Sequence, residues 1–274
     1  MFDSALLPVS FREPVSRLTE MIDFLGNLGA RRLSLLHVAA GPVSSSAETR
    51  LRQLADSIAE TAGVQVGSRV RSGSPAYEIA TSADEEGADF ICFPWKRKSW
   101  IQRTLVGSTT RDVIRLSSLP VLVHKSRAFR ADGHHFRVLY PTNFKDTDRF
   151  VVPYLKTPGL TADELILLTV RDRAPDPTAE SRAHRTCTEN LGRLADEVAG
   201  NYKKVVQMEV IGNPRRQISR VARRDGADFL VLGKSDRPDA LGSMMGSVAE
   251  EVANSAPCSV FIIGRAYLPE GGAR

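Results

Sequence analysis

The segment 233–247, which reads GKSDRPDALGSMMGS, has the residue types of a phosphate-binding loop. Gly-Lys-Ser ends the Walker A motif, in which backbone amides, a lysine and a hydroxyl hold the phosphates of a nucleotide. That motif requires a glycine five residues before the Gly-Lys glycine, and Asp228 stands at this position. The segment is therefore not a Walker A loop.

A different spacing is present in the same segment. Gly233 is followed after two residues by Asp236, and after nine more residues by Gly246-Ser247. Gly246-Ser247 precedes an amphipathic run that contains Val248 and Val252, so a helix is expected to start there. The free amides and the positive dipole end of such a helix attract anions. The sequence therefore predicts a phosphate site at Gly246-Ser247.

The elements that would position this loop occur twice in the chain. RSGSPAYEIATSADEEGADFICFP at 71–94 reappears as VIGNPRRQISRVARRDGADFLVLG at 210–233, an offset of 139, and ALLPVSF at 5–11 matches RVLYPTNF at 137–144 with an offset of 133. This repeat predicts two homologous domains, residues 1–127 and 134–267. The change of offset predicts a longer loop in the second copy, at the proline- and charge-rich segment 171–181.

Short apolar runs in each copy predict buried parallel strands. In the first copy they are 5–9, 33–38, 64–70, 90–93 and 121–124, and in the second they are 138–140, 165–170, 204–210, 229–232 and 259–263. Helical patterns separate them, and one of these patterns places Val15, Leu18, Ile22 and Leu25 on a single face. The alternation predicts an α/β fold with two tandem doubly wound parallel-sheet domains.

In open parallel sheets, ligands bind beyond the carboxyl ends of the strands, near the point where the strand order reverses. In the second copy, the turns at this edge begin at Pro141-Thr142-Asn143, after Val170, and at Leu232-Gly233. The loop that starts at Gly233 thus follows the fourth strand of its domain.

The loop spacing differs at one position from Gly-x2-Gly-x9-Gly-Ser. Together with the strand order and the segments GADF and APCSVFII, it makes both copies resemble the universal stress protein family; the most specific stretch is MGSVAEEVANSAPCSVFII at 245–263. The resemblance implies an adenine nucleotide α-hydrolase-like fold and a stress-response sensor or regulator. It also implies an intramolecular pseudo-dimer in which 120–124 and 259–264 pair. Association of two such chains into a homodimer stays open.

The resemblance further implies that the second copy binds ATP or another adenine nucleotide, with or without Mg²⁺. Asn143 would meet the ribose and Val170 would line the adenine pocket. The full set of expected contacts is Pro141, Thr142, Asn143, Val170, Leu232, Gly233, Ser235, Asp236, Gly246, Ser247 and Val248.

Several residues depart from the family pattern. Asn143 is uncharged where an acidic residue is expected, and Asp236 replaces a glycine. A carboxylate beside a triphosphate is repulsive unless Mg²⁺ bridges the two or the side chain turns outward. In the first copy, Ser10 takes the acidic position, and Pro94 and Arg97 replace both loop glycines. We therefore expect a degenerate nucleotide loop in the first copy and binding mainly in the second.

No arrangement of Ser, His and Asp or of Cys and His supports a catalytic site, so we expect no dedicated enzyme activity beyond slow ATP hydrolysis. The alternative function is a nucleotide-free interaction module that regulates an unknown partner protein, for example a transporter. The cluster WKRKSW at 95–100 is a weak signal for single-stranded nucleic acid. The net charge of +5 is too modest to favour nucleic acid as a partner.

Three widely spaced cysteines and the pair His134-His135 match no metal-ligand spacing, so no metal site is expected. No apolar run approaches the roughly 18 residues of a membrane helix, and the first residues do not resemble a signal peptide. These features predict a cytoplasmic protein without membrane insertion.

Overall fold

The structure is a computed structural model that describes residues 1–95, 108–125, 135–145, 147–157, 160, 162–234 and 247–264. The chain divides into two compact units. Unit 1 contains the described residues up to Lys125, and unit 2 contains those from His135 to Gly264. The boundaries that the sequence predicts at 127, 134 and 267 fall outside the described residues.

Strands and helices alternate along the described part of each unit. Unit 1 consists of β1 (Ser4–Pro8), α1 (Val15–Asn27), β2 (Arg32–Ala39), α2 (Ser45–Ala62), β3 (Gln65–Ser72), α3 (Pro75–Glu85), β4 (Phe90–Pro94), α4 (Ser108–Leu116) and β5 (Val121–His124). Unit 2 consists of β6 (Arg137–Thr142), α5 (Asp148–Leu155), β7 (Ala162–Arg171), α6 (Pro177–Val198), the short helix η2 (Ala199–Asn201), β8 (Tyr202–Ile211), α7 (Pro214–Arg224), β9 (Phe229–Gly233), α8 (Ser247–Ser255) and β10 (Ser259–Ile263).

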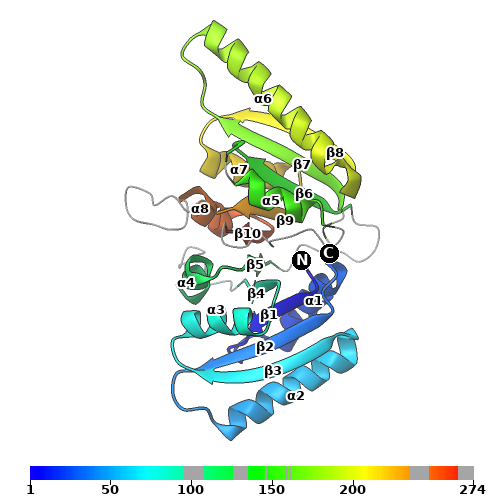
Figure 1. Cartoon of the computed structure of the whole chain (residues 1–274), viewed down its shortest axis with the longest axis vertical. Helices are drawn as coiled ribbons and strands as arrows, with labels where there is room; N and C mark the ends of the chain where they lie inside the picture. The colour runs from blue at the N-terminus through cyan, green and yellow to red at the C-terminus, as the bar shows by residue number, and fades with distance from the viewer. Residues whose placement is uncertain are drawn as a thin grey trace. The chain divides into compact units, whose positions relative to one another are not determined.

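The strands of each unit form a parallel sheet with the same order (Figure 1). In unit 1 the order is β3-β2-β1-β4-β5, and in unit 2 it is β8-β7-β6-β9-β10. With right-handed crossovers, this order places α1 and α2 on one face and α3 and α4 on the other. The contacts of α1 with α2 and of α3 with α4 agree with this placement. The predicted α/β fold is confirmed, and the strand order reverses between β1 and β4, and between β6 and β9.

The predicted strands are also confirmed, because each apolar run forms one strand within three residues of its expected ends. Residues such as Leu6, Leu139 and Phe261 are fully buried, as expected of strands with helices on both faces. One helix prediction was partly wrong: Leu18, Ile22 and Leu25 are buried on the inner face of α1, but Val15 is 56% exposed. Val15 is the first residue of α1, and the buried residues of this helix begin at Leu18.

The extra residues of the second copy do not lie in a longer loop, so that prediction was wrong. The loops 40–44 and 172–176 have equal length, and segment 177–181 already belongs to α6. Pro177 fits the first helical position and the Asp176 side chain caps the helix by accepting from the Ala179 amide at 2.9 Å. The additional length lies instead in α6, with 22 residues against 18 in α2, and in the three residues of η2.

The pairing of β5 with β10 in an intramolecular pseudo-dimer concerns the placement of one unit on the other, and it stays a prediction. None of the helices in the described ranges is long and apolar enough to span a bilayer.

Candidate functional site

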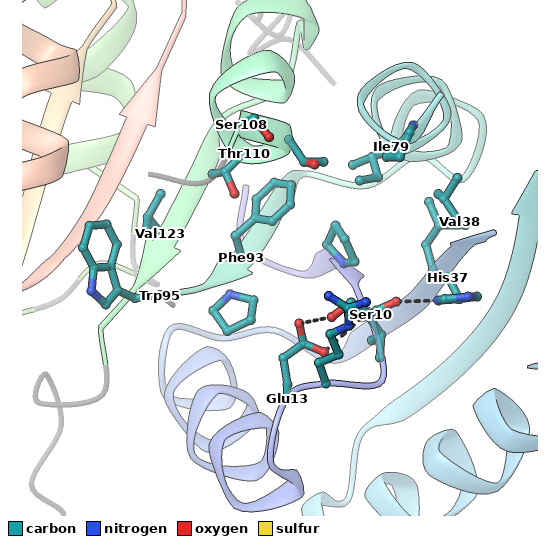
Figure 2. Close-up of a pocket in the computed structure, with 17 residues that line it drawn as sticks. Ser10, Glu13, His37, Val38, Ile79, Phe93, Trp95, Ser108, Thr110 and Val123 are labelled. Atoms are coloured by element: carbon teal, nitrogen blue, oxygen red, sulfur yellow. Dashed lines mark hydrogen bonds between the residues drawn. The ribbon is translucent and has the colours of Figure 1, made fainter. Parts of the chain in front are cut away.

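A cleft of about 490 Å³ opens in unit 1 at the carboxyl ends of its strands (Figure 2). Its lining residues come from the ends of β1, β2, β4 and β5, from the turn after β1, and from the amino-terminal parts of α3 and α4. They are Pro8, Val9, Ser10, Arg12, Glu13, Leu36, His37, Val38, Pro75, Ile79, Phe93, Pro94, Trp95, Ser108, Thr109, Thr110 and Val123. The cleft thus lies where the strand order reverses, which is the usual ligand position in doubly wound sheets.

Glu13 places a carboxylate in this cleft, three residues after Ser10. The Ser10 hydroxyl donates to Glu13 Oε1 at 2.6 Å, and the Ser10 amide donates to Oε2 at 3.1 Å. Figure 2 shows the two side chains turned toward one another. The pair has the Ser-x-x-Glu spacing of a capping box, but it closes the turn after β1 and does not cap α1, which starts at Val15. The two hydrogen bonds hold the carboxylate in one orientation.

His37 belongs to the same edge of the cleft, near the end of β2. Its Nδ1 lies 2.8 Å from the Val9 carbonyl oxygen, and its ring lies 4.4 Å from that of Phe11 between centroids. The Arg50 guanidinium covers the Phe11 ring at 4.6 Å. Phe11 has a φ of 59°, a left-handed conformation that is unusual for a non-glycine residue. These contacts fix the turn after β1.

Trp95 forms part of the cleft wall at the end of β4 and is held on several sides. The Lys125 ammonium lies 4.0 Å from the centre of its ring, a cation–π contact. The Trp95 carbonyl accepts from Arg17 Nη1 at 3.3 Å, and the Trp95 amide donates to the His124 carbonyl at 2.8 Å. These contacts fix Trp95 beside β5 and α1.

In unit 2, the structure brings several of the predicted site residues to the equivalent edge. Thr142 ends β6, Val170 lies one residue before the end of β7, and Leu232-Gly233 ends β9. Ser247 starts α8 and Val248 follows it. Ser235, Asp236 and Gly246 lie outside the described residues.

The polar groups after β6 bond within their own turn. The Thr142 hydroxyl donates to the Asp148 carboxylate at 2.8 Å and accepts from the Phe144 amide at 2.9 Å. Asn143 is exposed, and its side-chain oxygen accepts from the Lys145 amide at 3.2 Å. Phe144, with a φ of 57°, repeats the strained conformation of Phe11. A ligand would have to compete with these backbone amides.

Asp148 is a second carboxylate that follows a first strand. Tyr140, which is fully buried, donates to it through its hydroxyl at 2.6 Å. Burial raises the pKa of Asp148, although the hydrogen bonds from Tyr140 and Thr142 oppose the shift. The same burial raises the pKa of the Tyr140 phenol well above its usual range. Asp148 therefore fixes the start of α5 against β6.

Sequence reasoning missed Glu13 and Asp148 because it looked for an acidic residue directly after the first strand, at Ser10 and Asn143. The Ser-x-x-Glu spacing of 10–13 was a usable signal for Glu13. Asp148 starts the apolar helical run DRFVVPYL, and acidic residues are common in the first turn of a helix.

Some of the remaining candidates from the sequence lie outside the described residues, and others lie within them. The cluster 95–100 lies outside the described residues except for Trp95, as does His134. His135 faces Glu164, with 3.4 Å between Nε2 and the carboxylate. Among the described residues, no group of three or more His, Cys, Asp or Glu side chains is placed to hold a metal ion.

Comparisons with known proteins place these features in a family. The model of the universal stress protein family matches residues 19–125 and 137–264. Universal stress protein MJ0577 of Methanocaldococcus jannaschii is 23% identical over 153 residues, covering 47% of this chain and 94% of the relative. This relative matches about half of the chain, and the family model matches twice, so the chain contains two universal stress protein domains in tandem.

Solved structures match both units together. A universal stress protein from Archaeoglobus fulgidus has a TM-score of 0.69 and 22% identity, and the match covers 97% of each chain. The cytoplasmic domain of a prokaryotic cation chloride cotransporter has a TM-score of 0.51 and 15% identity, and the match covers 94% of each chain. At these identities the structures show a common fold. Because the family model matches most of unit 1 and nearly all of unit 2, the chain belongs to the universal stress protein family.

Proposed function

We propose that this chain is a cytoplasmic stress-response regulator that binds an adenine nucleotide, mainly in unit 2, and acts through a protein partner. The observation that carries the proposal is the cleft of unit 1. This cleft lies at the strand-order reversal of unit 1, and unit 2 repeats the same strand order at β6, β7 and β9, which supports an equivalent site there.

In unit 2, α8 supports binding of phosphates. Its first residue is Ser247, and the backbone amides of a first helical turn lie at the positive end of the helix dipole, which favours an anion. Val170 would contact the base beside Leu232, and Asn143 would meet the ribose. An amide oxygen is a weaker ribose acceptor than a carboxylate, because it lacks charge assistance.

In the described part of the two units, the hydroxyl–carboxylate pairs Ser10–Glu13 and Thr142–Asp148 bond within their own turns, and we assign no catalytic step to them. We therefore propose a regulatory role with at most slow hydrolysis. The presence of Mg²⁺ beside Asp236 is part of the proposal, because the ion would offset repulsion between that carboxylate and the phosphates.

Two equivalent valines allow a matched test. Val38 pairs in register with Arg71, and Val170 pairs with Val210; Arg71 and Val210 correspond in the repeat. Isothermal titration with Mg-ATP is expected to lose most of its heat in Val170→Trp and to keep most of it in Val38→Trp. Both variants should be checked by thermal unfolding.

The proposal fails if the purified chain carries no adenine nucleotide by native mass spectrometry and gives no heat with ATP, ADP or AMP. Retention of the full heat in Val170→Trp together with its loss in Val38→Trp would move the site to unit 1. The first result would show that the chain binds no adenine nucleotide. The second would show that it binds one in unit 1 and not in unit 2.

The second candidate function is a nucleotide-free module that regulates a partner such as a transporter. The observation that favours it is the fold shared with the cytoplasmic domain of a cation chloride cotransporter over 94% of both chains. This candidate predicts an empty protein that nevertheless co-purifies with a defined partner. A pull-down that is unaffected by added ATP would support it.

A further inference from the structure

A groove of about 530 Å³ opens in unit 2 between the end of α7 and the outer strands of the sheet. Because α7 packs against β7 and β8 is the outermost strand, the end of the helix forms one side of the groove and the strands form its floor (Figure 1). The groove lies near the amino ends of the strands, so it is separate from the nucleotide site proposed at their carboxyl ends.

The floor of the groove is apolar. Ile166 of β7 pairs in register with Val206 of β8, and Met208 follows two residues later on the same face of the strand. Ile166 is buried, whereas Val206 and Met208 are only half-buried. A methionine side chain adapts to differently shaped partners. The floor therefore offers a place for an apolar side chain of a ligand.

Cations surround this floor. Arg137, Glu164 and Lys204 lie side by side on three neighbouring strands, and Arg224 ends α7. The Glu164 carboxylate lies 3.6 Å from Lys204 Nζ and 3.9 Å from Arg137 Nε, and only 13% of its side chain is exposed. The Asp225 carboxylate accepts from Arg224 through both oxygens at 2.7 Å. The two carboxylates in the groove are therefore already paired.

The equivalent part of unit 1 is bridged by ion pairs. Met208 and Arg224 correspond in the repeat to Arg69 and Glu85. Arg69 Nη1 lies 3.5 Å from the Glu85 carboxylate, and Arg69 Nε lies 3.4 Å from that of Glu86, so the end of α3 is tied to β3. In unit 2, Arg224 Nη2 instead lies 3.2 Å from the Met208 sulfur. The groove is thus open where unit 1 has two ion pairs.

The helix beside the groove has also reversed its charge. α7, which reads PRRQISRVARR, has five arginines and no acidic residue, whereas α3, which reads PAYEIATSADE, has three acidic residues and no basic one. Arg220 and Arg223 are exposed, and Arg220 precedes Arg224 by one helical turn. They add positive charge beside the groove. This excess of cations attracts a partner of negative charge.

The composition of the groove favours a peptide as that partner. Single-stranded nucleic acid binds through aromatic side chains on which bases stack, and none of the described residues that line the groove is aromatic. A membrane-bound helix inserts its apolar face, but α7 buries Ile218 and Val221 in its own unit. An apolar floor with cations around it matches a peptide that carries an apolar side chain between carboxylates.

We propose that the groove between α7 and β8 binds an acidic segment of a partner protein. An apolar side chain of the segment lies on Val206 and Met208, and the flanking carboxylates accept from Lys204 and Arg224. The proposal rests on the proposed function only in that the chain acts through a protein partner. Binding of the segment does not require a nucleotide.

Two labelled peptides of equal charge test the groove. The probe is a fluorescein-labelled peptide of three Glu-Leu-Glu repeats, and its control has three Glu-Ser-Glu repeats. Fluorescence anisotropy is expected to show saturable binding of the leucine peptide, about tenfold or more tighter than the serine peptide, because burial of leucine on the floor is favourable. Added salt should weaken binding. A labelled oligothymidylate should bind no better than the serine peptide.

A double variant rebuilds the arrangement of unit 1 in the groove. Met208→Arg together with Arg224→Glu restores the pair that Arg69 and Glu85 form, and it is expected to weaken binding of the leucine peptide about tenfold or more. Arg52→Glu, at an exposed position of α2, is the control and should bind as the parent does. This control lowers the net charge of the chain further than the double variant does, so it separates the groove from overall charge.

The proposal is overturned if the leucine peptide does not bind, if the serine peptide or the oligothymidylate binds as tightly, or if the double variant keeps the parent affinity. Thermal unfolding of each variant separates lost binding from lost folding, and the contrast between the two peptides on the parent chain needs no variant. Val170→Trp should lose heat with Mg-ATP and keep the affinity for the leucine peptide. Failure of the nucleotide site is therefore distinguishable from failure of the groove.

Discussion

A β-carbon built on Gly233 would lie 2.6 Å from the β-carbon of Thr147. The methyl carbon of Thr147 and a methyl carbon of Val151 would lie at 3.0 and 3.2 Å. The turn before α5 therefore crosses the end of β9 at a distance that only glycine allows. This glycine of the predicted loop has a packing role, whether or not a nucleotide binds beyond it.

Gly233→Ala should therefore destabilise the chain by about 1–3 kcal/mol, the usual cost of forcing a methyl group into a packed site. Urea unfolding at pH 7 measures the change. Gly26→Ala is the control, because Gly26 lies in α1 and a β-carbon added there would meet nothing within 4 Å. That change should be neutral or stabilising, as alanine favours a helix over glycine by roughly 0.5–1 kcal/mol. A neutral Gly233→Ala would contradict the packing role.

Tyr140 and Asp148 should be energetically coupled. Asp148→Ala leaves the buried Tyr140 hydroxyl without its carboxylate partner, which should cost about 1–3 kcal/mol. Tyr140→Phe removes both the donor and the need for an acceptor, so the double variant should be more stable than the sum of the single changes predicts. Urea unfolding of the parent, the two single variants and the double variant gives the coupling energy between Tyr140 and Asp148. Simple additivity would show that the hydrogen bond contributes little.

The ion pairs around Arg171 should make the stability of unit 2 depend on pH. Arg171 donates to Glu180 through both terminal nitrogens, at 3.0 and 2.7 Å, and through Nε to Glu209. These bonds lower the pKa of Glu180 from 4.5 to about 2. A lowered pKa stabilises the folded chain above pH 4.5, and this contribution is lost as the pH falls toward 2.

Arg171→Met should remove that contribution. The difference in urea midpoint between the parent and the variant should be largest at pH 7 and should shrink at pH 3.5. Glu48→Gln is a suitable control, because Glu48 holds the equivalent place in α2, where Ala39 stands instead of Arg171. An equal difference at both pH values would show that Arg171 acts through packing alone.

The three thiols should be inert in the folded chain. Cys92, Cys187 and Cys258 are free and buried, and burial raises the pKa of Cys92 and of Cys187. Because the thiolate is the reactive form, Ellman's reagent should modify no cysteine in native protein and three in denaturant. Rapid modification of one thiol before unfolding would show that the segment packed over that thiol opens locally while the rest of the chain stays folded.

The strands could be predicted from the sequence because burial on both faces requires continuous apolar runs, such as LLHV in β2 and VFII in β10. The internal repeat assigned these strands to two homologous domains. The placement of the extra residues could not be read in the same way, since Pro177 and the charges around it are equally compatible with a loop and with the first turn of a helix.

The candidate site was harder to predict because its key contacts join residues a few positions apart through turns. Glu13 folds back onto Ser10, and Asp148 folds back onto Thr142. Both contacts depend on the left-handed residues Phe11 and Phe144, and phenylalanine gives no sequence signal for such a conformation. The residues at the sheet edge were thus identified, but the direction of their polar groups was not.

The greater length of α6 and the presence of η2 also determine where the second half of the chain has grown. The added residues enter ahead of β8, at the amino edge of its sheet (Figure 1). The carboxyl ends of the strands, where we propose the ligand site, are at the opposite edge, and the loops that leave β2 and β7 have the same length. A duplicated protein can therefore enlarge one half without changing the length of the loops at this edge, which leaves the two halves comparable there position by position.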